Sequence, residues 1–236
     1  MTMGWEKKHF VSNILGGLAL VAMIVSLYSV FFYAPIEQKQ KLAQKIFYFH
    51  VPSAWVSFLA FLVVFLASIL YLWKRDRMWD ILALSSAELG LLFCSLVLIT
   101  GPIWGKPVWG TWWSWDARLT TTLVLWLIYV AYLMLGAYGA DRARSARFRA
   151  VLGIVGFADV PLIYVSIRIW RTLHPGPVLL KEGGAPSGLP PAMFHTLMIC
   201  VGTFTLLYLY LLLKRISVER AEEELAWLRD RALDLG

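Results

Sequence analysis

Charged residues are scarce in this chain. Asp, Glu, Lys and Arg together make up 16% of the 236 residues, whereas soluble domains average about 25%. Hydrophobic residues reach 59%, which is more apolar side chain than one soluble core can bury. The composition therefore indicates a membrane protein. It excludes a disordered chain, and it excludes a nucleic-acid-binding module because the net charge of +7 has to be read against membrane topology first.

Cysteine is also rare, and the sequence has no CxxC motif and no cluster of Cys with His. Cys94 and Cys200 each lie inside a long apolar run, so we interpret both as small buried hydrophobic residues. This excludes a secreted disulfide scaffold. The glycine-rich P-loop that binds ATP is absent as well, so any energy from ATP has to come from another subunit.

Long apolar runs dominate what is present. A hydrocarbon core of about 30 Å requires about 20 apolar residues in a helix. The sequence predicts six such spans, at residues 13–33, 52–73, 81–103, 119–140, 150–169 and 191–213. The predicted fold is therefore all-α, a polytopic membrane protein with six transmembrane helices. The first run follows Lys7 and Lys8 like a signal peptide, but it exceeds an h-region of about 7 to 15 residues, so we expect it to stay as an anchor.

The basic residues predict an orientation for these spans. Of the 22 Lys and Arg residues, 14 fall on one side of the six spans and 8 on the other. The positive-inside rule then places both termini in the cytoplasm. The connections on the outer side are longer and more aromatic, so we expect the chemistry to face outward.

The connections differ in kind. Residues 34–49 predict a short interfacial helix leading into the second span. Residues 170–191 hold five of the ten prolines and predict an irregular loop. Residues 214–236 predict an amphipathic helix, either solvated or docked on a cytoplasmic partner. We therefore expect a membrane domain at residues 1–213 and a cytoplasmic helical tail at 214–236.

Tryptophan is clustered between the third and fourth spans, in residues 104–120, which we call the tryptophan segment. An aromatic belt at the membrane interface is one interpretation, but a belt distributes its residues over many helix ends. A surface of indole rings instead suits a large, flat, apolar ligand. Five of the twelve tryptophans lie here: Trp104, Trp109, Trp112, Trp113 and Trp115.

Charged residues accompany these rings. Lys106 and Arg118 supply cations for an anionic edge of the ligand, and an arginine can bind a carboxylate through two hydrogen bonds. Asp116 would be repelled by carboxylates, so we expect it to orient Arg118 or to cap the fourth span. A porphyrin with two propionates fits this set better than a sugar, an ion or a lipid tail.

The tryptophan segment resembles the tryptophan-rich signature of the heme-handling membrane proteins of cytochrome c maturation. The short, six-span form is similar to the heme exporter protein C family, CcmC. Two further stretches match that family, Tyr-Phe-His-Val-Pro-Ser-Ala at residues 48–54 and Trp-Arg-Thr-Leu-His-Pro-Gly at 170–176. The resemblance covers nearly the whole chain in span count, length and motif order.

The resemblance implies a function and a set of partners. The protein would bind heme b non-covalently at the outer face of the bacterial cytoplasmic (inner) membrane and deliver it to a membrane-anchored periplasmic heme chaperone. It would act beside the ATPase and membrane subunits of an ABC-type transporter and a small single-span membrane subunit. It would be a heme export or transfer subunit and not an enzyme. A cytochrome c synthase-type enzyme and a small-solute transporter remain as alternatives.

Histidines supply the candidate iron ligands, since neutral imidazole is a common axial ligand of heme. His50 and His174 both lie where an outer connection meets a span, so they can flank a ligand on the tryptophan surface. By chemistry alone His195 competes with His174, and the resemblance favours His174. The candidate heme-binding residues are His50, His174, Trp104, Trp109, Trp112, Trp113, Trp115, Asp116 and Arg118, with His50 and His174 as axial iron ligands.

Two acidic residues lie inside predicted spans, Glu88 in the third and Asp159 in the fifth. Intramembrane acids are candidates for function. Polar pairing between helices accounts for them equally well, so their roles stay open. Pro161 is expected to bend the fifth span.

Overall fold

The computed structural model describes residues 5–137, 141–170, 172–174 and 188–234. Within these ranges the chain is helical and contains no strand, apart from one isolated bridge between Glu37 and Lys41. The long helices are α1 (Trp5–Tyr28), α2 (Phe47–Lys74), α3 (Arg77–Trp109), α4 (Ala117–Ala137), α5 (Arg142–Phe157), α6 (Asp159–Ile169) and α7 (Pro191–Asp234).

Six segments are long and apolar enough to cross a membrane. They are Phe10–Tyr33, Leu42–Lys74, Arg77–Trp109, Ala117–Gly136, Arg142–Ser166 and Pro191–Leu233. Each overlaps one of the six runs expected from the sequence, so the all-α, six-span prediction is confirmed.

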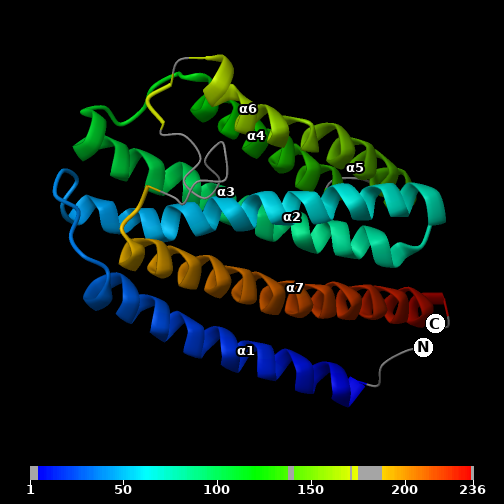
Figure 1. Ribbon diagram of the computed structural model, residues 1–236. Helices are drawn as coiled ribbons and strands as arrows, with labels where there is room; N and C mark the ends of the chain where they lie inside the picture. Colours follow the sequence, from blue (N-terminus) through cyan, green and yellow to red (C-terminus); the bar gives the residue numbers. More distant parts are fainter. Residues whose placement is uncertain (1–4, 138–140, 171, 175–187, 235–236) are drawn as a thin grey trace.

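The helices form a flattened bundle (Figure 1). Helices α2 and α3 lie in the middle, α7 and then α1 lie on one side, and α4, α5 and α6 lie on the other. The α2–α3 turn, the start of α5, the first turn of α1 and the last turn of α7 share one end, here called the basic end. The end of α3 and the start of α4 lie at the opposite end, here called the tryptophan end.

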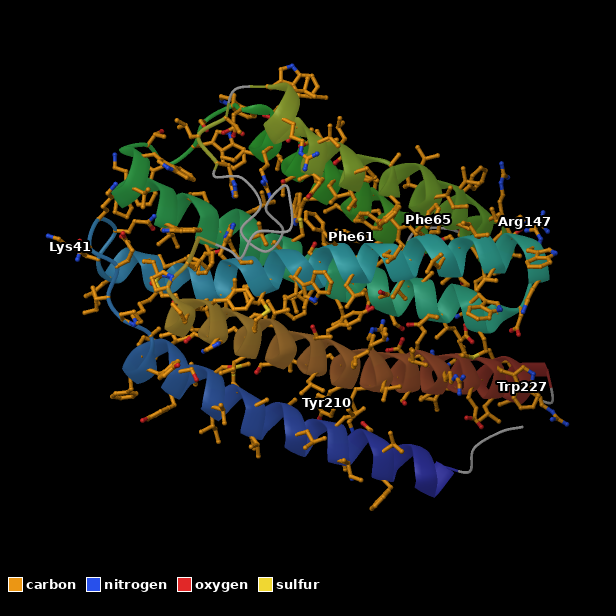
Figure 2. The ribbon with its side chains drawn as sticks, in the orientation of Figure 1. Lys41, Phe61, Phe65, Arg147, Tyr210 and Trp227 are labelled. Atoms are coloured by element: carbon orange, nitrogen blue, oxygen red, sulfur yellow. The ribbon has the colours of Figure 1, made fainter. Side chains whose placement is uncertain are left out.

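The core of the bundle depends on close contact between aromatic rings and helix backbones. The ring of Phe61 on α2 stacks on Tyr129 of α4, with 3.7 Å between centroids (Figure 2 labels Phe61). Gly90 of α3 faces the same ring, and a Cβ there would lie 2.6 Å from Phe61 Cε1. Only glycine therefore allows α2 and α3 to approach with this ring between them. Both aromatic side chains are fully buried.

Helix α3 is longer than the third span expected from the sequence. It continues past residue 103 to Trp109 and ends at Gly110, which has a left-handed φ of 77°. The sequence places the whole tryptophan segment between the third and fourth spans, but Trp104 and Trp109 lie on the last turns of α3. The Trp109 ring packs against Gly105, where a Cβ would lie 3.0 Å from it.

The fifth span is interrupted at Ala158, where α5 ends and α6 begins. Pro161 lies three residues later and lacks the N–H that would bond to the carbonyl of Phe157, so the break lies where the proline predicts a bend. Asp159 starts α6, and one of its carboxylate oxygens is buried with no hydrogen-bond partner among the described residues.

The segment before α2 differs from the expected interfacial helix. Of residues 34–49, only Leu42–Ile46 form a short 3-10 helix ahead of α2. Lys45 is buried here, and its Nζ donates hydrogen bonds to the carbonyls of Val30 (2.6 Å) and Ala34 (2.7 Å). The lysine therefore satisfies carbonyl groups around the π-helix Ser29–Tyr33 that ends the first span, which a solvent-facing interfacial lysine would not do.

The predicted tail is helical, but it is not a separate helix. Helix α7 runs without interruption through position 213 to Asp234. Arg215 of α7 donates to Glu88 of α3 over 2.9 Å, and Arg77 Nε donates to Glu223 over 2.6 Å. The pairing account of Glu88 therefore agrees with the structure. The division into domains 1–213 and 214–236 stays a prediction, and most of the proline-rich stretch 170–191 lies outside the described residues.

Candidate functional site

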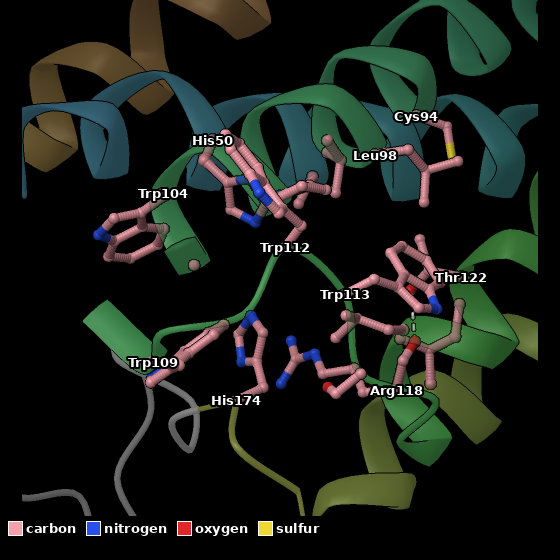
Figure 3. Close-up of a pocket in the computed structure, with 18 of the residues that line it drawn as sticks. His50, Cys94, Leu98, Trp104, Trp109, Trp112, Trp113, Arg118, Thr122 and His174 are labelled. Atoms are coloured by element: carbon pink, nitrogen blue, oxygen red, sulfur yellow. Dashed lines mark hydrogen bonds between the residues drawn. The ribbon is translucent and has the colours of Figure 1, made fainter. Parts of the chain in front are cut away.

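A cavity opens at the tryptophan end, between α2, α3, α4 and α6 (Figure 3). Its empty space is about 830 Å³ when the open mouth is included. Seven of the residues expected to bind the ligand line it: His50, Trp104, Trp109, Trp112, Trp113, Arg118 and His174.

The imidazole of His50 is held on one side of this cavity. His50 lies on the first turn of α2 and is 8% exposed. Its Nδ1 lies 2.8 Å from the hydroxyl oxygen of Thr100 on α3. Its ring meets the edge of Trp104, with 5.7 Å between centroids. Trp104 is fixed in turn, because its indole N–H donates to Gln40 over 2.9 Å.

His174 lies across the cavity from His50, and Figure 3 shows the open space between the two rings. It belongs to the short described segment 172–174 that follows α6. Its backbone N–H donates to the hydroxyl of Thr172 over 3.1 Å. Its ring lies 6.3 Å from that of Trp109. Two imidazoles from connections far apart in sequence therefore border one cavity.

Arg118 and the loop 110–116 complete the wall. Arg118 lies on the first turn of α4, and Figure 3 shows its guanidinium near His174. Trp113 is partly buried, and its indole N–H has no hydrogen-bond partner within the described part of the chain. Trp112 is 59% exposed at the mouth. The wall therefore offers an arginine, an unused N–H donor and several ring surfaces.

Two of the expected residues do not line the cavity. Trp115 is 76% exposed and packs edge-on against Trp113. Asp116 accepts a hydrogen bond from the backbone N–H of Leu119 and another from the hydroxyl of Ser114, both at 3.0 Å. Asp116 was expected either to orient Arg118 or to cap the fourth span. These contacts are those of a cap at the start of α4.

Lys106 and His195, the other polar residues considered from the sequence, do not line the cavity either. Lys106 donates to the carbonyl of Gly110 over 3.0 Å, lies near the Trp112 ring and does not line the cavity. His195 is exposed on the first turn of α7, where its ring contacts Phe194. The cavity therefore brings His50 together with His174 and not with His195.

The inner part of the cavity was not foreseen from the sequence. It is lined by apolar side chains from the spans, among them Phe58, Leu98 and Ile163, together with the thiol of Cys94. These residues look like ordinary lipid-facing or core positions in the sequence. Thr100 was missed too, and the available signal was its position one helical turn before Trp104.

Comparison with known proteins decides the family. The family model described as heme exporter protein C matches residues 5–230 of the chain. The chain belongs to the heme exporter protein C family. The heme exporter protein C of Bradyrhizobium diazoefficiens is 37% identical over 84% of this chain and 74% of its own length. Those of Haemophilus influenzae and Escherichia coli K12 are each 33% identical, over 91% and 87% of this chain and 86% and 83% of their own lengths.

Family membership and the six apolar helices together identify a multi-pass protein of the inner membrane. The family is that of heme export in cytochrome c maturation, in which this chain is one membrane subunit among others. A relative from Marchantia polymorpha, 34% identical over 69% of each chain, is described as a putative cytochrome c biosynthesis mitochondrial protein. The resemblance inferred from the tryptophan segment is confirmed.

Proposed function

We propose that this protein binds heme b non-covalently in the cavity at the tryptophan end, with His50 and His174 as axial ligands of the iron. The observation that carries this proposal is the placement of two imidazoles on opposite sides of one cavity walled by indole rings. A porphyrin supplies the equatorial nitrogens, so the protein needs to add only the two axial donors. Within the described ranges, no three His, Cys, Asp or Glu side chains gather as ligands for a bare metal ion.

The cavity also matches the two chemically different edges of heme b. Its inner wall is apolar, with Phe58, Leu98 and Ile163, and suits the vinyl and methyl edge. Arg118 lines the same cavity beside His174 and supplies a cation for a propionate. The unused indole N–H of Trp113 supplies a further donor. The residues present therefore fit the group.

Exposed rings beside the cavity support a transfer role. Trp112 and Trp115 present large apolar surface next to the mouth, 59% and 76% exposed. Such rings favour docking of a second protein. In this proposal that protein is a membrane-anchored periplasmic heme chaperone, and the tryptophan end faces the periplasm. The ATPase and membrane subunits of an ABC-type transporter and a small single-span subunit complete the complex. The protein is a transfer subunit in this proposal and not a synthase.

Single glycine substitutions of the ligands test the proposal. His50→Gly or His174→Gly should convert a low-spin heme into a five-coordinate or weakly held one, because one axial nitrogen is lost. Added imidazole should enter the vacated space and restore the low-spin α and β bands. The measurement is the optical spectrum of the purified, reduced protein together with its heme content.

His195→Gly is the matched control and should leave the spectrum unchanged, because His195 lies outside the cavity wall. If His195→Gly loses heme while His174→Gly keeps a normal spectrum, the assignment of the axial pair is wrong. If all three variants keep the wild-type spectrum, heme does not bind through these histidines.

A further inference from the structure

A pair of hydrogen bonds at Thr100 determines which nitrogen of His50 carries the proton. The Thr100 hydroxyl donates to the backbone carbonyl of Leu96, with 2.6 Å between the oxygens. The same oxygen lies 2.8 Å from His50 Nδ1. A threonine hydroxyl has one proton, and the Leu96 carbonyl, which can only accept, lies at the shorter of the two distances, so we assign the proton to that bond. Toward His50 the hydroxyl therefore acts as an acceptor, and Nδ1 carries the hydrogen.

The consequence concerns the other ring nitrogen. In a neutral imidazole with the proton on Nδ1, Nε2 keeps its lone pair and is free to bind a metal. Nδ1 faces Thr100 on α3, so Nε2 is the nitrogen left for a ligand, and the His50 side chain lines the cavity (Figure 3). The opposite tautomer places a hydrogen on Nε2 and cannot ligate iron.

The backbone of α3 supports the same ring position. Gly101 follows Thr100, and a Cβ at Gly101 would lie 3.4 Å from Cε1 of His50. The imidazole therefore rests against the helix at the residue next to its hydrogen-bond partner. Trp104, one turn further along α3, contacts the ring with its edge. Three consecutive contacts from one helix face hold the ring in a single orientation.

We propose that Thr100 is the positioning residue of His50: its hydroxyl accepts the Nδ1 hydrogen, keeps Nε2 unprotonated and aimed into the cavity, and so prepares this imidazole for heme iron before heme arrives. The inference rests on the proposed function, in which His50 is an axial ligand. In metal-binding histidines, a hydrogen bond from the ring N–H that does not face the metal fixes the tautomer and raises the basicity of the ligand nitrogen. Loss of the hydrogen-bond partner typically lowers metal affinity about 10- to 100-fold.

The test compares Thr100→Val with Thr100→Ser. Valine keeps the branched shape and removes the hydroxyl, so heme affinity should fall about 10- to 100-fold, and the midpoint potential should rise because a less basic imidazole stabilises ferric iron less. Serine keeps the hydroxyl and should retain both values. The measurements are heme titration and redox potentiometry on the full-length protein in detergent.

Thr205→Val is the matched control. The Thr205 hydroxyl also donates to the carbonyl four residues earlier, that of Val201, and accepts from a ring nitrogen, that of Trp55, but it lies away from the cavity. The Thr205→Val substitution should leave heme affinity and midpoint potential unchanged. A loss in Thr205→Val equal to that in Thr100→Val would show a general effect of removing a helix hydroxyl and would overturn the inference.

A double variant separates this inference from the proposed function. If Thr100 acts through His50, Thr100→Val should cause no further loss of heme affinity in a His50→Gly background. A full additional loss there would show that Thr100 acts independently of His50 and would overturn the inference. If His50→Gly alone keeps wild-type heme binding, the proposed ligand itself is wrong. If His50→Gly loses heme while Thr100→Val matches the wild type in affinity and potential, only the role of Thr100 is wrong.

Discussion

Among the described residues that line the cavity at the tryptophan end, Arg118 is the one Lys, Arg, Asp or Glu side chain. The sequence suggested Lys106 as a second cation for the ligand. In the structure, however, the Lys106 ammonium donates a hydrogen bond to the carbonyl of Gly110. The difference follows from the end of α3. Gly110 terminates that helix in a left-handed conformation, and a lysine one turn earlier reaches the free carbonyl. In the proposed function, Arg118 is therefore the described cavity residue that binds a propionate.

Replacing Arg118 by Gln tests this role. Heme affinity should fall roughly 10- to 100-fold, because a hydrogen bond to a charged group contributes about 1.5 to 3 kcal/mol. Heme whose propionates are methylated should bind the wild type and the variant equally, since the ester has no negative charge. The measurement is titration with both ligands, and Lys106→Gln is the control. An equal loss for heme and its dimethyl ester would contradict a propionate contact.

At the scale of helices, an ionic cluster joins three elements at the basic end. Asp80 of α3 is 2% exposed and accepts two hydrogen bonds from Arg149 of α5, at 2.9 and 2.8 Å. Arg77 also pairs with Asp80 and reaches Glu223 of α7. A buried carboxylate between two arginines holds α3, α5 and α7 in register, away from the cavity at the tryptophan end.

Replacing Asp80 by Asn should destabilise the protein by about 3 to 5 kcal/mol, because Arg149 is then left as a buried charge without its partner. Thermal unfolding in detergent measures the loss. Asp76→Asn is the control: Asp76 caps α3 by accepting from the N–H of Met78, and asparagine caps equally well. If both variants unfold at the wild-type temperature, the cluster contributes nothing to stability.

For the whole molecule, the first turn of α1 and the last turn of α7 both lie at the basic end, because six spans return the chain to the side where it began (Figure 1). The cavity lined by His50 and His174 lies at the opposite end. The excess of Lys and Arg then predicts that the basic end is cytoplasmic and the cavity periplasmic.

Reporter fusions test this orientation. Fusions after Arg77, Arg147 and Gly236 should report the cytoplasm, and fusions after Lys106 or Gly184 should report the periplasm. The reason is the distribution of basic residues, 14 against 8 on the two sides. Paired fusions to a fluorescent protein and a periplasmic phosphatase provide the measurement. Phosphatase activity at Gly236 would contradict both the orientation and the six-span count.

The six spans, the helical class and the family could all be predicted from the sequence alone. A run of about 20 apolar residues has one stable form in a bilayer, a helix with every backbone hydrogen bond made internally. The tryptophan segment and the stretches around His50 and His174 were specific enough to indicate the family before any geometry was known. Each of these features lies within one continuous stretch of residues, so it can be recognised without knowledge of the fold.

Which residues contact one another across helices could be known only from the tertiary structure. His174 and His195 were equivalent by local chemistry, and the fold separates them because α7 lies on the opposite side of α2 and α3 from α4 and α6. The bond between Thr100 and His50 joins residues 50 positions apart. Contacts of this kind arise when helices pack together, and helix packing depends on side-chain shapes that no single segment contains.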